Sequence, residues 1–271
     1  MFRHIAVRAR QASIVGIVTV AACGFFRPAV SSSTPIPTRP RAVPAVLAKA
    51  ALSMPADSEG VRVYKAARSY KGAKIMVSTE SRWLWFIVGR DTLMSAPVAI
   101  GMGKDFEFNG KKYHFSTPRG RRKVLKKEEN PIWTVPVWHY YERAAERSLQ
   151  AVAVKPGEIY PLADGTWIEV RDGQVGRVNQ FGNFWPFSPG IEIMFEDKIY
   201  IPPLDTPQRR VPEALGPVKL DMGQGYLIHG THIYNEDSIG RAVSHGCVRM
   251  RNEDVERLYS MVEPGTPVFI F

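Results

Sequence analysis

One stretch near the C-terminal end, Tyr226 to Met250, constrains this chain most strongly. It contains two strand-like runs, and reactive side chains lie within and between them. The apolar residues before His229 predict a strand that ends at Gly230, and Ser244 to Met250 predict a second strand. One of the two cysteines and three of the six histidines fall in this stretch: Cys247, His229, His232 and His245. We expect the rest of the chain to be organised around it.

The second predicted strand surrounds a thiol with basic groups. Alternation along an extended strand would put His245, Cys247 and Arg249 on one face. Cations near a cysteine lower the pKa of the thiol and populate the thiolate, which is the nucleophilic form. The two glycines of the region would let the backbone approach a ligand closely and present amide N–H groups to an oxyanion. The pattern indicates a cysteine nucleophile.

Three other interpretations of these residues are a core cysteine, a zinc site and a papain-like protease. A cysteine in an apolar strand is ordinarily a small core residue. A zinc site is a second possibility, with four candidate ligands in His229, His232, His245 and Cys247. Their spacing differs from that of the usual zinc motifs and no carboxylate stands in an obvious metal motif, so we expect no metal. A papain-like protease is disfavoured, because there the cysteine lies far upstream of its histidine.

The order of these residues resembles a known family. His229 is followed after fourteen residues by Ser244-His245-Gly246-Cys247, with Arg249 two positions further on. This pattern resembles the signature of the L,D-transpeptidase (YkuD-type) catalytic domain. The turn Thr117-Pro118-Arg119-Gly120 matches the family's T-P-x-G turn, and the segment 130–136 also resembles a family segment. The resemblance covers about residues 73–271 and is weakest across 104–116 and 151–210.

The resemblance implies a cysteine acyltransferase that acts on peptidoglycan stem peptides through a thioester acyl-enzyme. By the family pattern Cys247 is the nucleophile, His229 exchanges the proton, and the carbonyl of Gly230 orients the imidazole. The donor pocket and oxyanion hole would be shaped by Ser244, His245, Gly246 and Arg249. Acyl transfer needs no metal or organic cofactor, so none is expected.

The acceptor is left open by this pattern. A neighbouring stem-peptide amine would give a cross-link, water would give an L,D-carboxypeptidase, and a protein lysine would tether a protein to the wall. A non-catalytic wall-binding module is the alternative of a different class. The intact pair of His229 and Cys247 argues against it, because a binding module would have no need of both.

The hydrophobic pattern predicts the fold class. Short β-rich runs are expected over Lys74–Thr79, Trp83–Val88 and Ala96–Ile100, and strand character resumes over Ile191–Ile201. Glu142–Leu149 is expected to be a short helix, and residues 151–190 extra strands or a lid. After the Cys247 motif, one apolar helix face is formed by Val255, Leu258, Tyr259 and Val262. With a closing strand over Val268–Phe271, we expect a mainly β, sandwich-like domain with one helix in its C-terminal region.

Charge and length limit the partners. The chain has 271 residues, a formal net charge of +10 and an isoelectric point near 9.7. Such a surface favours anionic membrane headgroups, nucleic acid or an acidic wall polymer. We exclude nucleic acid, because the positive charge is dispersed and no nucleic-acid motif is recognised.

The N-terminal segment predicts export. Arginines precede an apolar run from Ala12 to Ala22, which is too short to span a bilayer comfortably. Val20-Ala21-Ala22-Cys23 resembles the lipobox of bacterial lipoproteins, with lipidation at Cys23; an ordinary cleaved signal is the alternative. We therefore divide the chain into an export signal (1–23), a Pro/Ser-rich linker with a variable segment (24–72) and a catalytic domain (73–271). The expected location is the cell envelope, periplasm or outer surface, as a membrane-anchored lipoprotein.

Replacing Cys23 with Ser tests the lipid anchor. The Cys23→Ser variant should leave the membrane fraction and appear in the soluble fraction, because a serine side chain has no thiol to receive the lipid. Fractionation of cells that express each form, followed by immunoblotting, measures the change. A variant that stays in the membrane fraction would contradict lipidation and favour an uncleaved N-terminal anchor.

Overall fold

The computed structural model describes residues 51–271. The assignments made for the export signal, for Cys23 and for most of the Pro/Ser-rich linker lie outside these residues. These described residues belong to one compact unit. No helix within 51–271 has the length and apolarity needed to cross a lipid bilayer.

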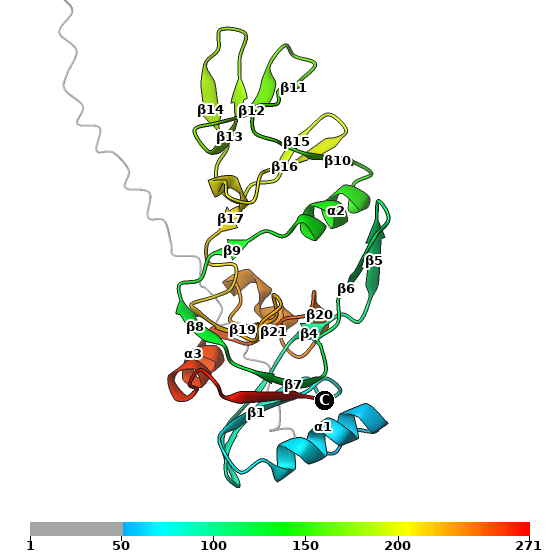
Figure 1. Cartoon of the computed structure of the whole chain (residues 1–271), viewed down its shortest axis with the longest axis vertical. Coiled ribbons are helices and arrows are strands. Elements are labelled where there is room, and N and C mark those ends of the chain that lie inside the picture. The colour runs from blue at the N-terminus through cyan, green and yellow to red at the C-terminus, as the bar shows by residue number, and fades with distance from the viewer. Residues whose placement is uncertain (1–50) are drawn as a thin grey trace, which may run out of the picture. The chain divides into compact units, whose positions relative to one another are not determined.

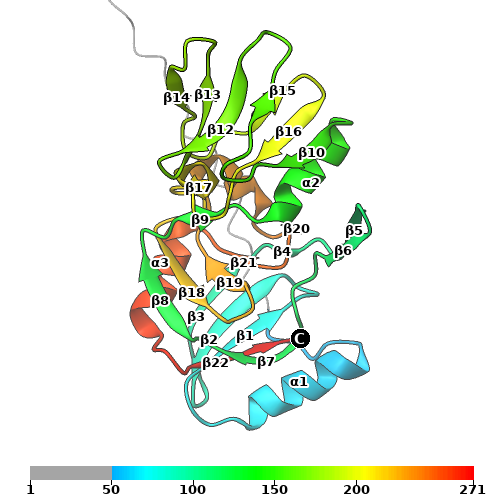
Figure 2. The ribbon, with the colours of Figure 1, turned by 45° about the horizontal axis from the view of Figure 1, so that its top comes forward.

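A five-stranded sheet forms one side of the main hydrophobic core (Figures 1 and 2). Its order is β3-β2-β1-β22-β7, in which β1 and β22 run parallel and the other neighbours antiparallel. Alternate residues of β1 bury different faces: Ile75 and Val77 join the main core, whereas Met76 joins a second cluster. The strands are β1 (Lys74–Ser78), β2 (Trp83–Val88), β3 (Asp91–Pro97), β7 (Gly120–Lys123) and β22 (Pro267–Ile270).

A four-stranded sheet packs against the first and holds the candidate site. Its order is β21-β19-β18-β8. Residues of both sheets and of helix α3 (Asn252–Met261) form the main hydrophobic core, in which Val255 and Leu258 are fully buried. Two facing sheets with alternating inward residues make the sandwich-like arrangement. The strands are β8 (Lys126–Glu129), β18 (Val218–Asp221), β19 (Leu227–His229) and β21 (Val248–Arg249).

Helix α1 (Ser58–Ser69) covers the outer face of the five-stranded sheet (Figure 1). Asp57 caps it, because its carboxylate accepts a hydrogen bond of 2.8 Å from the Gly60 N–H. Val63 and Ala67 of the helix pack on the second cluster of the sheet. Strands β1 and β2 are therefore buried on both faces, which explains their nearly continuous apolar sequence.

Residues 137–211, from the start of α2 to the end of β17, form an insertion that follows β9 (Figure 2). It begins with α2 (Val137–Glu146), which contacts β10, β16 and β5. Two small sheets follow, with orders β11-β12-β13-β14 and β10-β16-β15, and they enclose a hydrophobic cluster of their own. Their strands are β10 (Gln150–Ala153), β11 (Tyr160–Pro161), β12 (Trp167–Arg171), β13 (Gln174–Val178), β14 (Phe184–Pro186), β15 (Ile193–Phe195) and β16 (Lys198–Ile201).

Short pairings connect these parts. Three two-stranded ladders pair β4 with β20, β5 with β6, and β9 with β17. Their bounds are β4 (Ile100–Gly101), β20 (Ala242–Ser244), β5 (Asp105–Phe108), β6 (Lys111–His114), β9 (Trp133–Thr134) and β17 (Arg210–Val211). Two 3₁₀ helices complete the described chain, η1 (Pro207–Arg209) and η2 (Ile233–Ser238).

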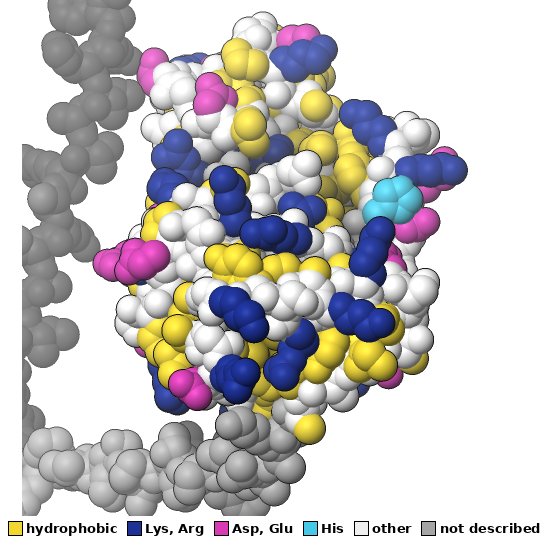
Figure 3. Space-filling model, turned by 60° about the horizontal axis from the view of Figure 1, so that its bottom comes forward, with side chains coloured by type: hydrophobic (Ala, Val, Ile, Leu, Met, Phe, Trp, Pro, Cys, Tyr) yellow, Lys and Arg dark blue, Asp and Glu magenta, His cyan; other side chains and the backbone are white. Residues whose placement is uncertain are grey.

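The mainly β architecture, the helix α3 and the closing strand β22 confirm the sequence prediction. Several boundaries differ from those predicted, two of them substantially. The run Ala96–Ile100 is the end of β3 followed by β4, because Val98 and Ala99 hydrogen-bond outside both strands, to Arg82 and Arg249. The short helix near Glu142 begins five residues earlier than predicted and ends before Leu149. On the face in Figure 3, Lys and Arg side chains are spread out, as their dispersal along the sequence suggests.

Candidate active site

The parallel pairing of β19 with β21 brings the two halves of the Tyr226–Met250 stretch together. Ile228 pairs with Val248, and His229 pairs with Arg249. The first pair is fully buried in the main core, so the second pair faces the other side of the sheet. Cys247 precedes β21 by one residue and lies beside Leu227, so its side chain is on the His229 side. The two candidate catalytic residues are thus diagonal neighbours on adjacent strands.

His229 is buried and is held by a backbone carbonyl. Its Nδ1 lies 2.5 Å from the carbonyl oxygen of Gly230. A carbonyl oxygen only accepts hydrogen bonds, so the proton of the neutral ring is on Nδ1 and Nε2 keeps its lone pair. Burial, with the charge of Arg249 as the second cause, lowers the pKa of His229 to about 3, and the carbonyls of Gly230 and Leu215 oppose this shift.

Cys247 is half-buried, and its thiol donates to the carbonyl of Gly225 at 3.7 Å. Burial raises the pKa of this thiol, and the opposing effects of the Leu227 N–H and of Arg249 are smaller. The sequence prediction of a lowered pKa was therefore wrong, because it counted the cation and not the loss of water. The pair rests as a neutral thiol and a neutral imidazole.

The chain turns sharply just before Cys247. Ser244 is buried at the end of β20, where its hydroxyl donates to the Cys247 carbonyl at 2.6 Å and accepts from the Gly246 N–H at 3.1 Å. Gly246 has a φ of +128°, and a Cβ there would lie 2.9 Å from the Tyr226 ring and 3.1 Å from the Ser116 carbonyl oxygen. The single strand predicted from Ser244 to Met250 was therefore wrong: a turn separates β20 from β21.

His245 consequently does not share a face with Cys247. Its Nε2 lies 2.9 Å from the carboxylate of Glu142 on α2. Its ring stacks on Trp138, with ring centroids 4.2 Å apart, and meets the ring of Phe115 edge-on at 4.5 Å. No local pattern in the sequence indicated the partner on α2, which lies about one hundred residues away in the chain. Trp138 covers one face of this imidazole.

Two further residues, Asn252 and Thr117, support the site. Asn252 is the first residue of α3, after the N-cap Arg251, and its side chain accepts from the Thr231 N–H at 2.9 Å. A Cβ on Gly230 would collide with the oxygen of this side chain. Position 230, whose carbonyl accepts from the His229 ring, therefore requires glycine.

Thr117, in the turn that resembles the family's T-P-x-G, is also buried. Its hydroxyl accepts from the Gly101 N–H at 2.8 Å, and a Cβ on Gly101 would lie 2.7 Å from the Phe115 carbonyl oxygen. This contact ties the turn to β4, which pairs with β20 ahead of Cys247.

The four candidate zinc ligands are engaged separately. His229 contacts Gly230, and His245 contacts Glu142. His232 accepts from the Tyr234 N–H at 3.4 Å, and the Cys247 thiol donates to the Gly225 carbonyl. Within residues 51–271, no group of three or more His, Cys, Asp or Glu side chains is gathered to hold a metal ion.

A cavity of about 590 Å³ lies beyond the Asn252–Thr231 contact. Cys247 and His229 do not line it, so it is separate from the candidate site. Its lining residues are Asn130, Pro131, Pro212, Glu213, Gly216, Pro217, Thr231, His232, Asn252 and Glu256.

Comparison with known proteins identifies the family. The model of the L,D-transpeptidase catalytic domain, YkuD, matches residues 72–270. The chain belongs to this family. The probable L,D-transpeptidase YbiS of Escherichia coli K12 is 29% identical over 196 residues, which cover 72% of this chain and 42% of that protein. The chain therefore matches less than half the length of this relative.

Two further similarities were found to L,D-transpeptidases. The probable L,D-transpeptidase YcfS of Escherichia coli K12 is 48% identical over 48 residues, which cover 18% of this chain and 14% of that protein. The crystal structure of an L,D-transpeptidase from Xylanimonas cellulosilytica has a TM-score of 0.39 at 14% identity, covering 79% of this chain and 70% of that one.

The turn at Gly246 gives a matched test. Gly246→Ala and Gly265→Ala both place a Cβ at positive φ, but only the first meets neighbours, since nothing lies within 4 Å of the second. Each should lose about 1–2 kcal/mol of stability through backbone strain. Only Gly246→Ala should also slow modification of Cys247 by a thiol-directed reagent, because relief of the collision displaces the turn. Equal modification rates in both variants would contradict this role.

Burial of neutral His229 predicts a pH dependence of stability. With a folded pKa near 3 and an ordinary value of 6.5, the unfolded chain binds the extra proton between these two values. Stability due to this group is complete above about pH 6.5 and is lost as the pH falls toward 3. Between pH 7 and 4.5 the parent should lose on the order of 2 kcal/mol more than His229→Gln in urea unfolding. Parallel pH profiles would show that His229 is not buried neutral.

Proposed function

We propose that this protein is a cysteine acyltransferase that acts on peptidoglycan stem peptides through a thioester on Cys247. The observation that carries the proposal is the parallel register of β19 and β21, in which His229 pairs with Arg249 and Cys247 directly precedes Val248, the partner of Ile228. Membership of the L,D-transpeptidase family supports the reaction class. Stem peptides of the wall are the corresponding substrate class.

In the first step Cys247 acts as the nucleophile. The sulfur attacks the carbonyl carbon of a stem-peptide bond while Nε2 of His229 takes the thiol proton. The new S–C bond is retained as a thioester when the C–N bond breaks. The amine of the terminal D-amino acid then leaves with the proton from His229. Burial, which lowers the pKa of His229, also favours the return of this proton from the ring to the departing amine.

In the second step an amine of a neighbouring stem attacks the thioester carbonyl. A C–N bond forms, the S–C bond breaks, and the thiol is restored with a proton that His229 takes from the attacking amine. Water in place of the amine would give a carboxypeptidase, and a protein lysine would tether a protein to the wall. The mass of the product distinguishes these three acceptors.

The neutral resting pair fits this sequence of steps. A raised thiol pKa protects Cys247 from indiscriminate alkylation and oxidation, because the reactive thiolate is scarce before substrate arrives. Arg249 favours the thiolate, and by disfavouring the imidazolium it favours the return of the proton to the leaving amine. The Ser244–Gly246 turn fixes the backbone beside the nucleophile, where an oxyanion hole for the tetrahedral intermediate is required.

The location follows from the substrate. A wall-modifying activity requires the cell envelope, and the N-terminal basic and apolar run with Cys23 supports export as a lipid-anchored protein. A positively charged surface suits an anionic wall or membrane surface.

Replacement of Cys247 tests the nucleophile. Cys247→Ala should abolish product formation from muropeptides and leave the unfolding midpoint nearly unchanged, because one small side chain replaces another. Product masses resolved by mass spectrometry distinguish cross-linked, trimmed and protein-linked products. Parent protein without any product would contradict catalysis and favour a wall-binding module. Full activity in Cys247→Ala would remove the nucleophile assignment.

An adduct measurement accompanies this experiment. A carbapenem should add its whole mass to the parent by ring opening on Cys247, and His229→Ala should slow this addition. A chelator should leave the rate unchanged. Activity that is lost on chelation and restored by zinc, with no adduct at Cys247, would favour the metal alternative.

A further inference from the structure

The imidazole of His245 is enclosed by contacts that the proposed reaction does not use. Its Nε2 contacts the Glu142 carboxylate at 2.9 Å, and both side chains are only 22% exposed. Trp138 lies against one face of the ring at an interplanar angle of 27°, and Phe115 meets it at 82°. Glu142 and Trp138 are both on α2, at positions that lie on one side of the helix. The ring is therefore held by two residues of a single element.

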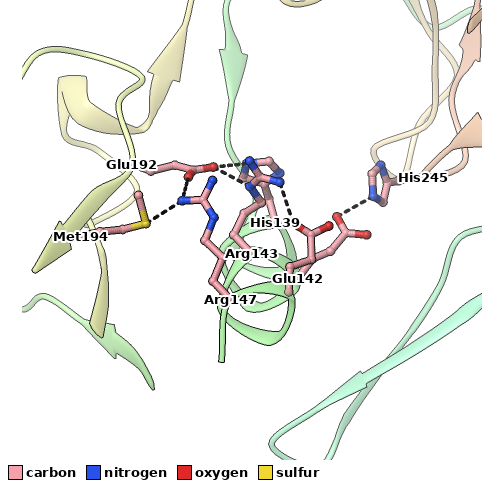
Figure 4. Close-up of polar contacts among 8 residues, drawn as sticks. His139, Glu142, Arg143, Arg147, Glu192, Met194 and His245 are labelled. Atoms are coloured by element: carbon pink, nitrogen blue, oxygen red, sulfur yellow. Dashed lines mark hydrogen bonds and ion pairs between the residues drawn. The ribbon is translucent and has the colours of Figure 1, made fainter. Parts of the chain in front are cut away.

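Helix α2 is itself fixed from the other side by the insertion. Glu192, just before β15, accepts from Arg143 Nε at 2.7 Å and pairs with Arg147 at 3.0 Å (Figure 4). In Figure 4 these contacts and the Glu142–His245 contact lie on different sides of α2. Tyr140 and Ala144 of the helix are buried in a cluster with β16. Residues 137–211 thus reach the candidate site through α2.

The Glu142–His245 contact is connected to Cys247 through the backbone of residues 244–247. His245 is the residue between Ser244, which bonds the Cys247 carbonyl, and Gly246, which has the positive φ. Holding this side chain in place therefore restrains the turn that carries Cys247. A shift of the imidazole is opposed by a hydrogen bond to a carboxylate and by two aromatic contacts.

We infer that Glu142 is a positioning residue for the Cys247 turn: its carboxylate accepts from Nε2–H of His245, and α2 thereby links the insertion to the nucleophile. The inference rests on the proposed function for its consequence on rate, and on geometry alone for the hydrogen bond. It assigns the insertion a part in setting the position of Cys247.

The charges around His245 agree with this arrangement. Glu142 and Glu146 face it from α2, with His139 on the same helix, and Arg249 faces it from β21. Burial is the largest cause and lowers the pKa of His245, so the ring is neutral near pH 7. A neutral imidazole has one N–H, and a carboxylate can only accept, so that proton is on Nε2.

Variants at Glu142 test the inference. Glu142→Ala removes the acceptor, whereas the amide oxygen of Glu142→Gln can still accept from Nε2–H. We expect Glu142→Ala to slow carbapenem acylation and muropeptide turnover by about tenfold, and Glu142→Gln to stay within about threefold of the parent. Glu158→Gln is the matched control, because Glu158 pairs with Lys155 and Tyr160 in the insertion, away from α2.

The imidazole nitrogen signals of His245 provide a readout that is independent of activity. In protein labelled with ¹⁵N-histidine, the parent and Glu142→Gln should show a protonated Nε2, and Glu142→Ala a mixture of tautomers. Glu192→Gln should lower the acylation rate in the same direction by a smaller factor. Its effect should not add to that of Glu142→Ala, because both act through α2.

The outcomes are distinguishable. Rates and nitrogen signals unchanged in Glu142→Ala would overturn the inference, as would an equal loss in the Gln and Ala variants. A parent protein that forms neither adduct nor product would contradict the proposed function, while the nitrogen signals would still decide whether Glu142 holds His245. Unfolding midpoints close to the parent's establish that the Ala variant is folded.

Discussion

The parallel pairing of β19 with β21 is the constraint on which the site depends. Ile228 and Val248 are fully buried in the core between the two sheets, and this burial fixes the register of the pair. A slip by one residue would turn His229 into the apolar core and expose the two aliphatic side chains. The hydrophobic core thus determines which face carries His229 and the cysteine beside β21. The packing of the sandwich core therefore also sets the geometry of the candidate site.

Burial also determines the protonation states of the pair. It raises the pKa of Cys247 and lowers that of His229, so both groups rest uncharged although Arg249 is close. Desolvation outweighs the nearby cation because the cost falls on the charged form of each group. A neutral thiol is a poor target for oxidants and simple alkylating agents. In the proposed reaction, reactivity then depends on a substrate whose carbonyl carbon aligns with the thiol as the proton is transferred, which favours selectivity for that substrate.

The insertion at residues 137–211 has its own hydrophobic cluster and yet contacts the motif that contains the cysteine. Helix α2 makes this connection, with Glu192 on one side and His245 on the other (Figure 4). An insertion that only enlarged the domain would not need a hydrogen bond to the residue two positions before the candidate nucleophile. The contact through Glu142 is the physical basis for treating this segment as part of the site.

The sequence by itself determined the fold class, the helix α3 with its apolar face, the closing strand and the family, because these depend on local periodicity and on a motif of nearby residues. It could not determine the turn at Gly246, because Tyr226 and Ser116, which leave no room for a Cβ there, approach it only in the folded chain. The partners of His245 and Asn252 were likewise hidden, because Glu142 and Thr231 are distant in sequence. The sign of the Cys247 pKa shift needed the tertiary structure for the same reason: neighbouring charges can be read from a sequence, but the exclusion of water is a property of the packed molecule.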